Sequence, residues 1–146
     1  MLVLDATTKS ITVAMAGAAT TTNPTFVTAY SDDTGTSFTE GSSDGALSGT
    51  SQVTLVAAPA ASTRRLVKTI YIQNTDTVAN TLTITYNDNG TLRGIVKVTL
   101  QVNDTWSTDG TTDANGNLKT ASNFNGILPI ANGGTGTQYG VNGGTF

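Results

Sequence analysis

The strongest constraint on the fold is the Asn89-Gly90 pair, which ends an Asn-Asp-Asn-Gly turn between two runs of alternating side chains. Asn and Gly both tolerate the positive φ angles that a tight hairpin turn requires. Period-two alternation on both sides of such a turn predicts an antiparallel β-hairpin. The apolar residues expected on one face of this hairpin are Leu82, Ile84, Tyr86, Leu92, Val96, Val98 and Leu100.

The same period-two pattern recurs along the chain, and no window has a helical period. Further strands are expected around residues 11–15, 26–30, 53–57 and 66–72. In the last of these, Leu66, Ile70 and Ile72 should share one face, interrupted by Lys68. The polar stretch 31–50 is expected to be a long surface loop, with at most a short strand near 37–39. Strand breaks are expected at 74–76 and 103–104. Short strands at this spacing predict an all-β fold, an antiparallel β-sandwich or a jelly roll.

The composition supports a β fold. Threonine accounts for 30 of the 146 residues, and its β-branched side chain suits half-exposed strands. Disorder usually combines low hydrophobicity with high net charge, whereas the net charge here is only −3. The chain has no cysteine and no histidine, so it lacks disulfides, thiolate chemistry and the commonest general base.

The C-terminal stretch differs from the rest of the sequence. Residues 123–146 contain seven glycines, four asparagines and few apolar side chains. Such a segment buries too little apolar surface to offset the entropy of ordering it alone, so it is either disordered or held by a neighbouring chain. We therefore expect a β-sandwich domain over residues 1–122 and an extended Gly/Asn-rich arm over 123–146 that is ordered by a neighbouring molecule.

Several motifs that could carry chemistry have simpler interpretations. Residues 133–136 are rich in glycine, but a phosphate loop needs a following helix, and none is expected. Residues 113–117 place oxygen ligands at short spacing, yet a plain Asn-Gly turn explains them better than structural calcium. The carboxylates of Asp32, Asp33, Glu40 and Asp44 resemble solvated loop acids more than a hydrolytic pair. We therefore expect a protein that is not an enzyme, with no catalytic residue, metal or cofactor.

The charge pattern and apolar runs also limit the partners. Seven basic against ten acidic residues give no nucleic-acid footprint, and no apolar run approaches the roughly 20 residues that span a bilayer. Trp106 is expected to pack on the core, with an interface role as the alternative. Arg64 and Arg65, with Lys68, form the one basic cluster, which could make inter-subunit ion pairs or be a solvated strand end. The possible assembly contacts are Arg64, Arg65, Phe124, Ile127, Leu128, Tyr139 and Phe146.

Parts of the sequence resemble tailed-bacteriophage virion proteins. The segment 54–65 (TLVAAPAASTRR), with 71–77 and 86–91, is similar to a recurrent segment of these proteins, and residues 2–5 and 113–120 fit the same pattern. Separately, residues 128–136 (LPIANGGTG) are similar to a short motif of phage tail-fibre and other virion proteins. The resemblance implies an all-β structural protein of the virion, assembled in the host cytoplasm.

Such domains serve at several places on a particle, so three functions remain open. The first is a capsid decoration (cement) protein, a subunit of a trimer whose partners are the major capsid protein or other virion proteins. We favour it because the chain stops ten residues after the fibre motif. The second is a tail-fibre base or tail adaptor that links a host-recognition element to the particle. The third is a small carbohydrate-binding or depolymerase domain.

Overall fold

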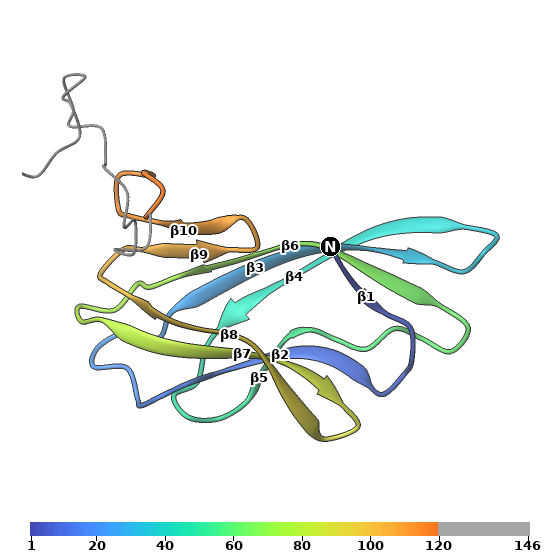
Figure 1. Cartoon of the computed structure of the whole chain (residues 1–146), viewed down its shortest axis with the longest axis horizontal. Coiled ribbons are helices and arrows are strands. Elements are labelled where there is room, and N and C mark those ends of the chain that lie inside the picture. Colours follow the sequence, from blue (N-terminus) through green and yellow to red (C-terminus); the bar gives the residue numbers. More distant parts are fainter. Residues whose placement is uncertain (120–146) are drawn as a thin grey trace, which may run out of the picture.

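The computed structural model describes residues 1–119, which form two antiparallel β-sheets packed face to face (Figure 1). This arrangement confirms the predicted all-β sandwich. None of the described residues belongs to a helix, so none of them supplies a helix able to cross a membrane. The strands are β1 (Leu2–Leu4), β2 (Lys9–Met15), β3 (Thr25–Asp33), β4 (Phe38–Ala46), β5 (Val53–Val56), β6 (Arg64–Gln73), β7 (Asn80–Asp88), β8 (Thr91–Leu100), β9 (Thr105–Ser107) and β10 (Gly110–Thr112).

The chain crosses repeatedly between the two layers. The first sheet has the order β10-β9-β6-β3-β4, with β1 also paired to β6, and the second has the order β5-β2-β7-β8. Three hairpins, β3–β4, β7–β8 and β9–β10, stay within a layer. The β3–β4 turn lies at one end of the sandwich, and the β6–β7 loop lies at the other (Figure 1).

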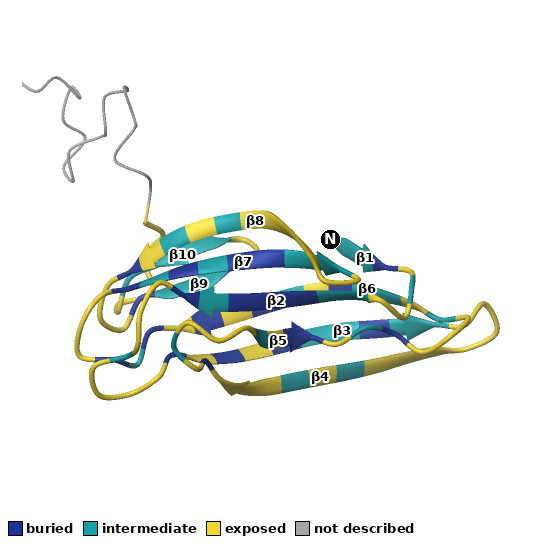
Figure 2. Ribbon diagram, turned by 90° about the horizontal axis from the view of Figure 1, so that it is seen from below, coloured by how far each residue is buried: buried dark blue, intermediate teal, exposed yellow. Residues whose placement is uncertain are grey.

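The core lies between the layers because strand alternation places the apolar side chains there. The central strands β2 and β7 are the most buried, whereas β4 is largely exposed (Figure 2). Ile11 and Val13 are fully buried, and Thr12 between them hydrogen-bonds Thr85 on the opposite face of the sheet. The buried apolar residues are Leu4, Ile11, Val13, Met15, Phe26, Leu47, Leu55, Val56, Val67, Ile70, Ile72, Leu82, Ile84 and Leu100.

The β7–β8 hairpin forms as predicted, with one correction. Asn89 and Gly90 have φ angles of 51° and 88°, and Asp88 pairs with Thr91 across the turn. The register then shifts, because Ile84 pairs with Val96 and Thr85 with Gly94, which leaves Ile95 as an extra residue. A bulge of this kind inverts the alternation of faces between the residues on its two sides. Leu92, predicted on the core face, therefore lies on the outer face and is 47% exposed.

A second bulge corrects the prediction for β6. Tyr30 pairs with Val67 and Ala29 with Thr69, so Lys68 is the extra residue. The core face of β6 is therefore formed by Val67, Ile70 and Ile72, and Leu66 is not part of it. The interruption at Lys68 was visible in the sequence, but the change of face that it produces was not.

The prediction of a long loop over residues 31–50 is wrong. β3 extends to Asp33, and β4 pairs with it through nine residues without a register shift. The core-facing positions of β4 are small because aromatic rings from β3 occupy the adjacent space. A Cβ atom on Gly41 would lie 2.7 Å from the Tyr30 ring, and one on Gly45 would lie 3.0 Å from the Phe26 ring. β4 therefore has no apolar alternation to recognise.

Both predicted strand breaks are confirmed, and buried side chains hold them. Asn74 donates through Nδ2 to the carbonyl oxygens of Val78, Leu100 and Gln101 at 2.8–3.0 Å. The buried Asp104 carboxylate accepts from the Gln101 amide and from Lys119. These contacts join the loops that follow β6 and β8 at one end of the sandwich.

Asp76 anchors a third loop, the one between β2 and β3, at the same end of the sandwich. Its carboxylate accepts from the backbone amides of Thr20, Thr21, Thr22 and Thr77, from the Thr21 hydroxyl and from Asn80 Nδ2. Burial alone would raise the pKa of this carboxyl group, but these donors hold the pKa well below its usual range. The β2–β3 loop is therefore anchored by an ionised, fully hydrogen-bonded carboxylate.

Candidate interaction surface

The outer face of β3 and β6 carries an exposed apolar pair. Val27 and Tyr71 are cross-strand partners, and they are 54% and 46% exposed. A shallow hollow of about 210 Å³ adjoins them, lined by Thr25, Phe26, Val27, Tyr71, Gln73 and Thr105. An exposed aromatic residue flanked by small hydroxyl side chains is typical of a surface that contacts another molecule.

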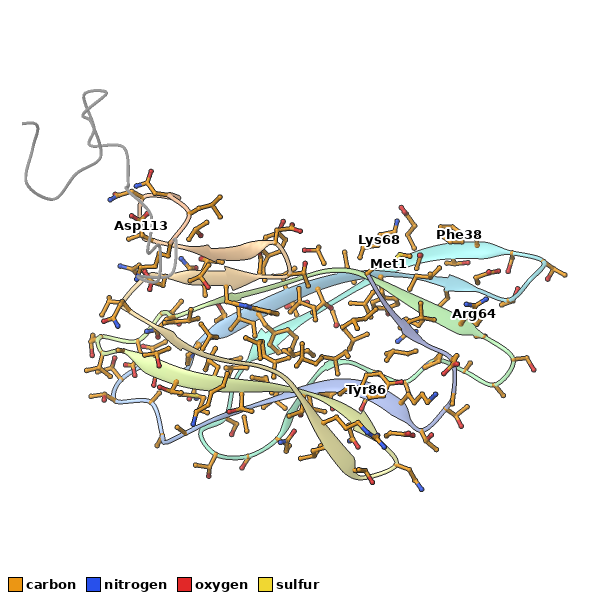
Figure 3. All side chains as sticks on the ribbon, in the orientation of Figure 1. Met1, Phe38, Arg64, Lys68, Tyr86 and Asp113 are labelled. Carbon is orange, nitrogen blue, oxygen red and sulfur yellow. The ribbon has the colours of Figure 1, made fainter. Side chains whose placement is uncertain are left out.

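The bulged residue Lys68 organises the same face near the β3–β4 turn. Its ammonium group forms an ion pair with Glu40 and lies 5.7 Å from the centroid of the Phe38 ring. The hydrogen bond from Lys68 lowers the pKa of the Glu40 carboxyl group. Phe38 is 60% exposed, and Figure 3 shows it beside Lys68 on the outside of the hairpin. A hollow of about 420 Å³ lies here, lined by Ala29, Tyr30, Glu40, Gly41, Ser42 and Lys68.

The structure separates the two adjacent arginines that the sequence placed in one cluster. Arg65 points inward, where it donates to both Asp32 oxygens at 2.7 Å and to the Ala57 carbonyl oxygen at 3.0 Å. Its guanidinium also lies 3.9 Å from the Tyr30 ring centroid. Arg64 is exposed because neighbouring strand residues face opposite sides. Of the two, Arg64 is the residue whose charge is presented to solvent.

β4 is an uncovered sheet edge. Within residues 1–119 it pairs with β3 alone. Edge strands usually carry bulges, lysines or proline, or are very short, because unpaired backbone groups invite another chain. The edge strand β8 has a bulge, Arg93 and Lys97, and β5 and β10 have four and three residues. β4 is nine residues long and has no bulge, no proline and no lysine, and its two charged residues, Glu40 and Asp44, are acidic.

The carboxylates considered as catalytic or metal-binding groups are dispersed. Asp32 faces inward against Arg65, and the Arg65 hydrogen bonds lower its pKa. Glu40 lies on the outer face with Lys68. Asp113 accepts hydrogen bonds from the backbone amides of Asn115 and Asn117, which lie in the same turn. Among residues 1–119, no group of three or more Asp, Glu, His or Cys side chains is placed to hold a metal ion.

The remaining predicted contacts have different outcomes. Trp106 is partly buried against the core, which confirms the packing prediction. The arm residues Phe124, Ile127, Leu128, Tyr139 and Phe146, and the glycine-rich stretch 133–136, lie outside the described residues. Sequence reasoning missed β4 and the exposed groups Val27, Phe38 and Tyr71. The alternation of Val27 with the core residues Phe26 and Thr28 was a usable signal for its exposure.

Comparisons of the chain with protein-family models, with curated proteins and with solved structures yield no match. Evidence for the function therefore comes from the candidate interaction surface and from the sequence resemblance.

Proposed function

We propose that this chain is a structural protein of a tailed-bacteriophage virion, and specifically a capsid decoration (cement) protein that stabilises the head shell. The observation that carries the proposal is the long uncovered edge of β4, which lies beside an exposed apolar face. A monomer that works alone gains nothing from such an edge and risks aggregation. The resemblance of residues 54–65 to virion proteins supplies the setting.

In this proposal the subunit, one of three in a trimer, binds the major capsid protein or a neighbouring virion protein. The outer face around Tyr71 and Val27 supplies contacts to the shell, and the Gly/Asn-rich arm lies across neighbouring subunits. Each contact is small, but many copies on a repeating shell add avidity without any strong single site. No catalytic step is assigned, because Asp32 and Glu40 are each ion-paired with a basic side chain.

The alternative is a tail-fibre base or tail adaptor protein. The similarity of residues 128–136 to a tail-fibre motif favours it. The two proposals differ in copy number, since a cement protein covers the whole shell and an adaptor occupies one site at the tail.

The test is a binding assay with shells assembled without this protein. Purified full-length chain should bind across the shell surface, and image reconstruction should show density at every equivalent position. Binding should raise the temperature at which the shells disrupt, because a ligand that prefers the intact state stabilises it. A variant that lacks residues 123–146 should bind much more weakly. Binding confined to the tail would favour the adaptor, and no binding to any particle would refute both proposals.

A further inference from the structure

We propose that the uncovered edge of β4 binds residues 124–130 of a second copy of this chain as an added, parallel strand. The inference deepens the proposed assembly role and rests on it, because it names the partner of one surface. Four observations carry it: the direction of the free backbone groups, the small side chains on the inner face of β4, the charges on its outer face, and the sequence of the last 27 residues.

The first observation identifies which backbone groups of β4 are free. Leu47 donates its amide to the Pro24 carbonyl oxygen, and the Ser37 carbonyl oxygen accepts from Thr34, so the odd-numbered positions at both ends of β4 bond to β3. Because the register is unbroken between them, the same holds for residues 39–45. The N–H and C=O groups of the even-numbered residues therefore point away from β3. These residues are Phe38, Glu40, Ser42, Asp44 and Ala46.

The second observation concerns the inner face. The residues on this face of β4 have small side chains or none: Gly41, Ser43 and Gly45. The Tyr30 ring lies over Gly41, and the Phe26 ring lies over Gly45. The Ser43 hydroxyl is already used, since it donates to the Leu55 carbonyl oxygen at 2.6 Å. An added strand with apolar side chains at alternate positions would cover the partly buried Tyr30 ring and extend the core.

The third observation limits the charge of the added strand. Glu40 and Asp44 both lie on the outer face of β4, and β4 has no basic residue. If two β4 strands paired about Ser42, each Glu40 would face the partner's Asp44, and like charges directly opposite are destabilising. The occupant therefore carries no acidic side chain on this face, which excludes a second β4.

The fourth observation supplies such a strand. Residues 120–146 contain no charged residue. Within them Phe124, Gly126, Leu128 and Ile130 occupy alternate positions, so a strand here would have one apolar face. Pro129 lies between these positions, so its side chain would be on the opposite face of the strand, and as a proline it has no N–H to donate.

Pro129 fixes the direction of pairing. In an antiparallel pair, the free residues of β4, whose side chains face outward, would bond to outward-facing residues of the added strand, and Pro129 would leave one bond unmade. In a parallel pair, the same β4 residues bond to inward-facing residues. The bonding residues are then Phe124 to Ile130 at alternate positions, and Pro129 faces away from β4. The parallel arrangement satisfies both the apolar face and the proline.

The added strand comes from another copy because the chain between Lys119 and Phe124 is too short to reach β4 of the same copy. Lys119 donates its amide to Thr111, so the described chain ends beside β10. β4 lies four strands away in the same sheet, which is about 19 Å at the usual strand spacing. The five residues from Lys119 to Phe124 span at most about 18 Å when fully extended. Donation from each copy to the next is a head-to-tail contact, which forms a closed ring when the rotation between neighbours brings the last copy back to the first, as the proposed trimer requires.

The test uses cross-linking, because the chain has no cysteine of its own. Full-length Ser42→Cys and a tagged full-length Asn125→Cys are mixed and treated with a short thiol cross-linker. We expect a mixed dimer as the main product, because both side chains lie on the outer face of the joined strands. Thr83→Cys, on the outer face of the second sheet, replaces Ser42→Cys as the control and should give at least tenfold less mixed dimer.

A matched pair of substitutions tests the face and the register. Added to the Asn125→Cys chain, Leu128→Asn should abolish the mixed dimer, whereas Ile127→Asn should leave it unchanged. Equal products with Ser42→Cys and Thr83→Cys, or equal effects of the two asparagines, would overturn the proposal. The particle-binding assay is separate: cross-linking without particle binding contradicts the cement function alone, and particle binding without cross-linking contradicts the strand exchange alone.

Discussion

The guanidinium of Arg65 holds both carboxylate oxygens of Asp32 at 2.7 Å, and it does so on the inner face of the first sheet. A paired, planar contact of this kind is among the stronger ion pairs in proteins. The Tyr30 ring lies against the same guanidinium, so the aromatic ring that covers Gly41 is also fixed by this pair. The ion pair, the ring and the β4 edge are thus one packing unit.

Removal of the acidic partner should destabilise this unit. We expect Asp32→Ala to lower the free energy of unfolding by about 1–2 kcal/mol, a value reduced from that of a fully buried pair because Asp32 is partly exposed. Urea denaturation at pH 7 measures the change. Asp44→Ala is the control, since Asp44 has no ion-pair partner within residues 1–119, and it should stay within about 0.5 kcal/mol of wild type.

Asp76 should make stability depend on acid pH. Its pKa is lowered in the folded state, so its contribution is present above the pKa of the unfolded chain, about 4, and is lost as pH falls towards the folded value. The melting temperature of wild type should therefore fall between pH 5 and pH 2. The same decrease in an Asp76→Asn variant, across the same pH range, would show that Asp76 is not responsible.

Gly41 should not accept a side chain. Its added Cβ would overlap the Tyr30 ring, so Gly41→Ala should cost about 1–3 kcal/mol of unfolding free energy. Gly94 is a matched control because it lies in β8 with no atom within 4 Å of an added Cβ. Gly94→Ala should remain within about 0.5 kcal/mol of wild type by the same denaturation assay. Equal losses in both variants would rule out the ring contact as the cause.

Gly90 should be required for its backbone angle and not for space. Its φ is +88°, and nothing lies within 4 Å of an added Cβ. Gly90→Ala should therefore cost about 1 kcal/mol through strain alone. Asn89→Gly, at the neighbouring position with φ of 51°, should change stability by less than half of that. Thermal unfolding of the two variants provides the comparison.

Tyr71 should matter for particle binding more than for folding. It is 46% exposed, so Tyr71→Ser should shift unfolding by no more than about 0.5 kcal/mol while it weakens shell binding. Leu92, similarly exposed on the outer face of the other sheet, provides the comparison through Leu92→Ser, which should bind shells normally. If both variants bind equally well, the outer face around Tyr71 is not the contact surface.

The parts of the fold that were predictable are those in which local chemistry and burial agree. The Asn89-Gly90 turn requires positive φ angles, and the strands beside it alternate, so the hairpin could be derived from sequence. The bulges at Lys68 and Ile95 could not, because one inserted residue reverses the face of everything beyond it without changing composition.

β4 was unpredictable for a different physical reason. Its core-facing side is filled by rings that belong to β3, so the information about this strand lies in Phe26 and Tyr30 and not in β4 itself. The candidate interaction surface was unpredictable for the same reason, because contacts between strands decide which side chains it presents. The sequence shows Arg65 as a charge beside Arg64, but only the cross-strand register with Asp32 shows that its guanidinium is ion-paired within the subunit.

The uneven anchoring of the two ends of the sandwich has a practical consequence. Buried Asp76 and Asn74 bind the loops at one end, whereas the Thr34–Ser37 turn stands at the other, and its Gly35 has open space around it (Figure 1). A foreign peptide inserted at Gly35 would meet solvent and leave the anchored loops intact. If the protein covers a shell in many copies, as proposed, that turn would become a dense, regularly spaced platform for vaccine epitopes or affinity tags.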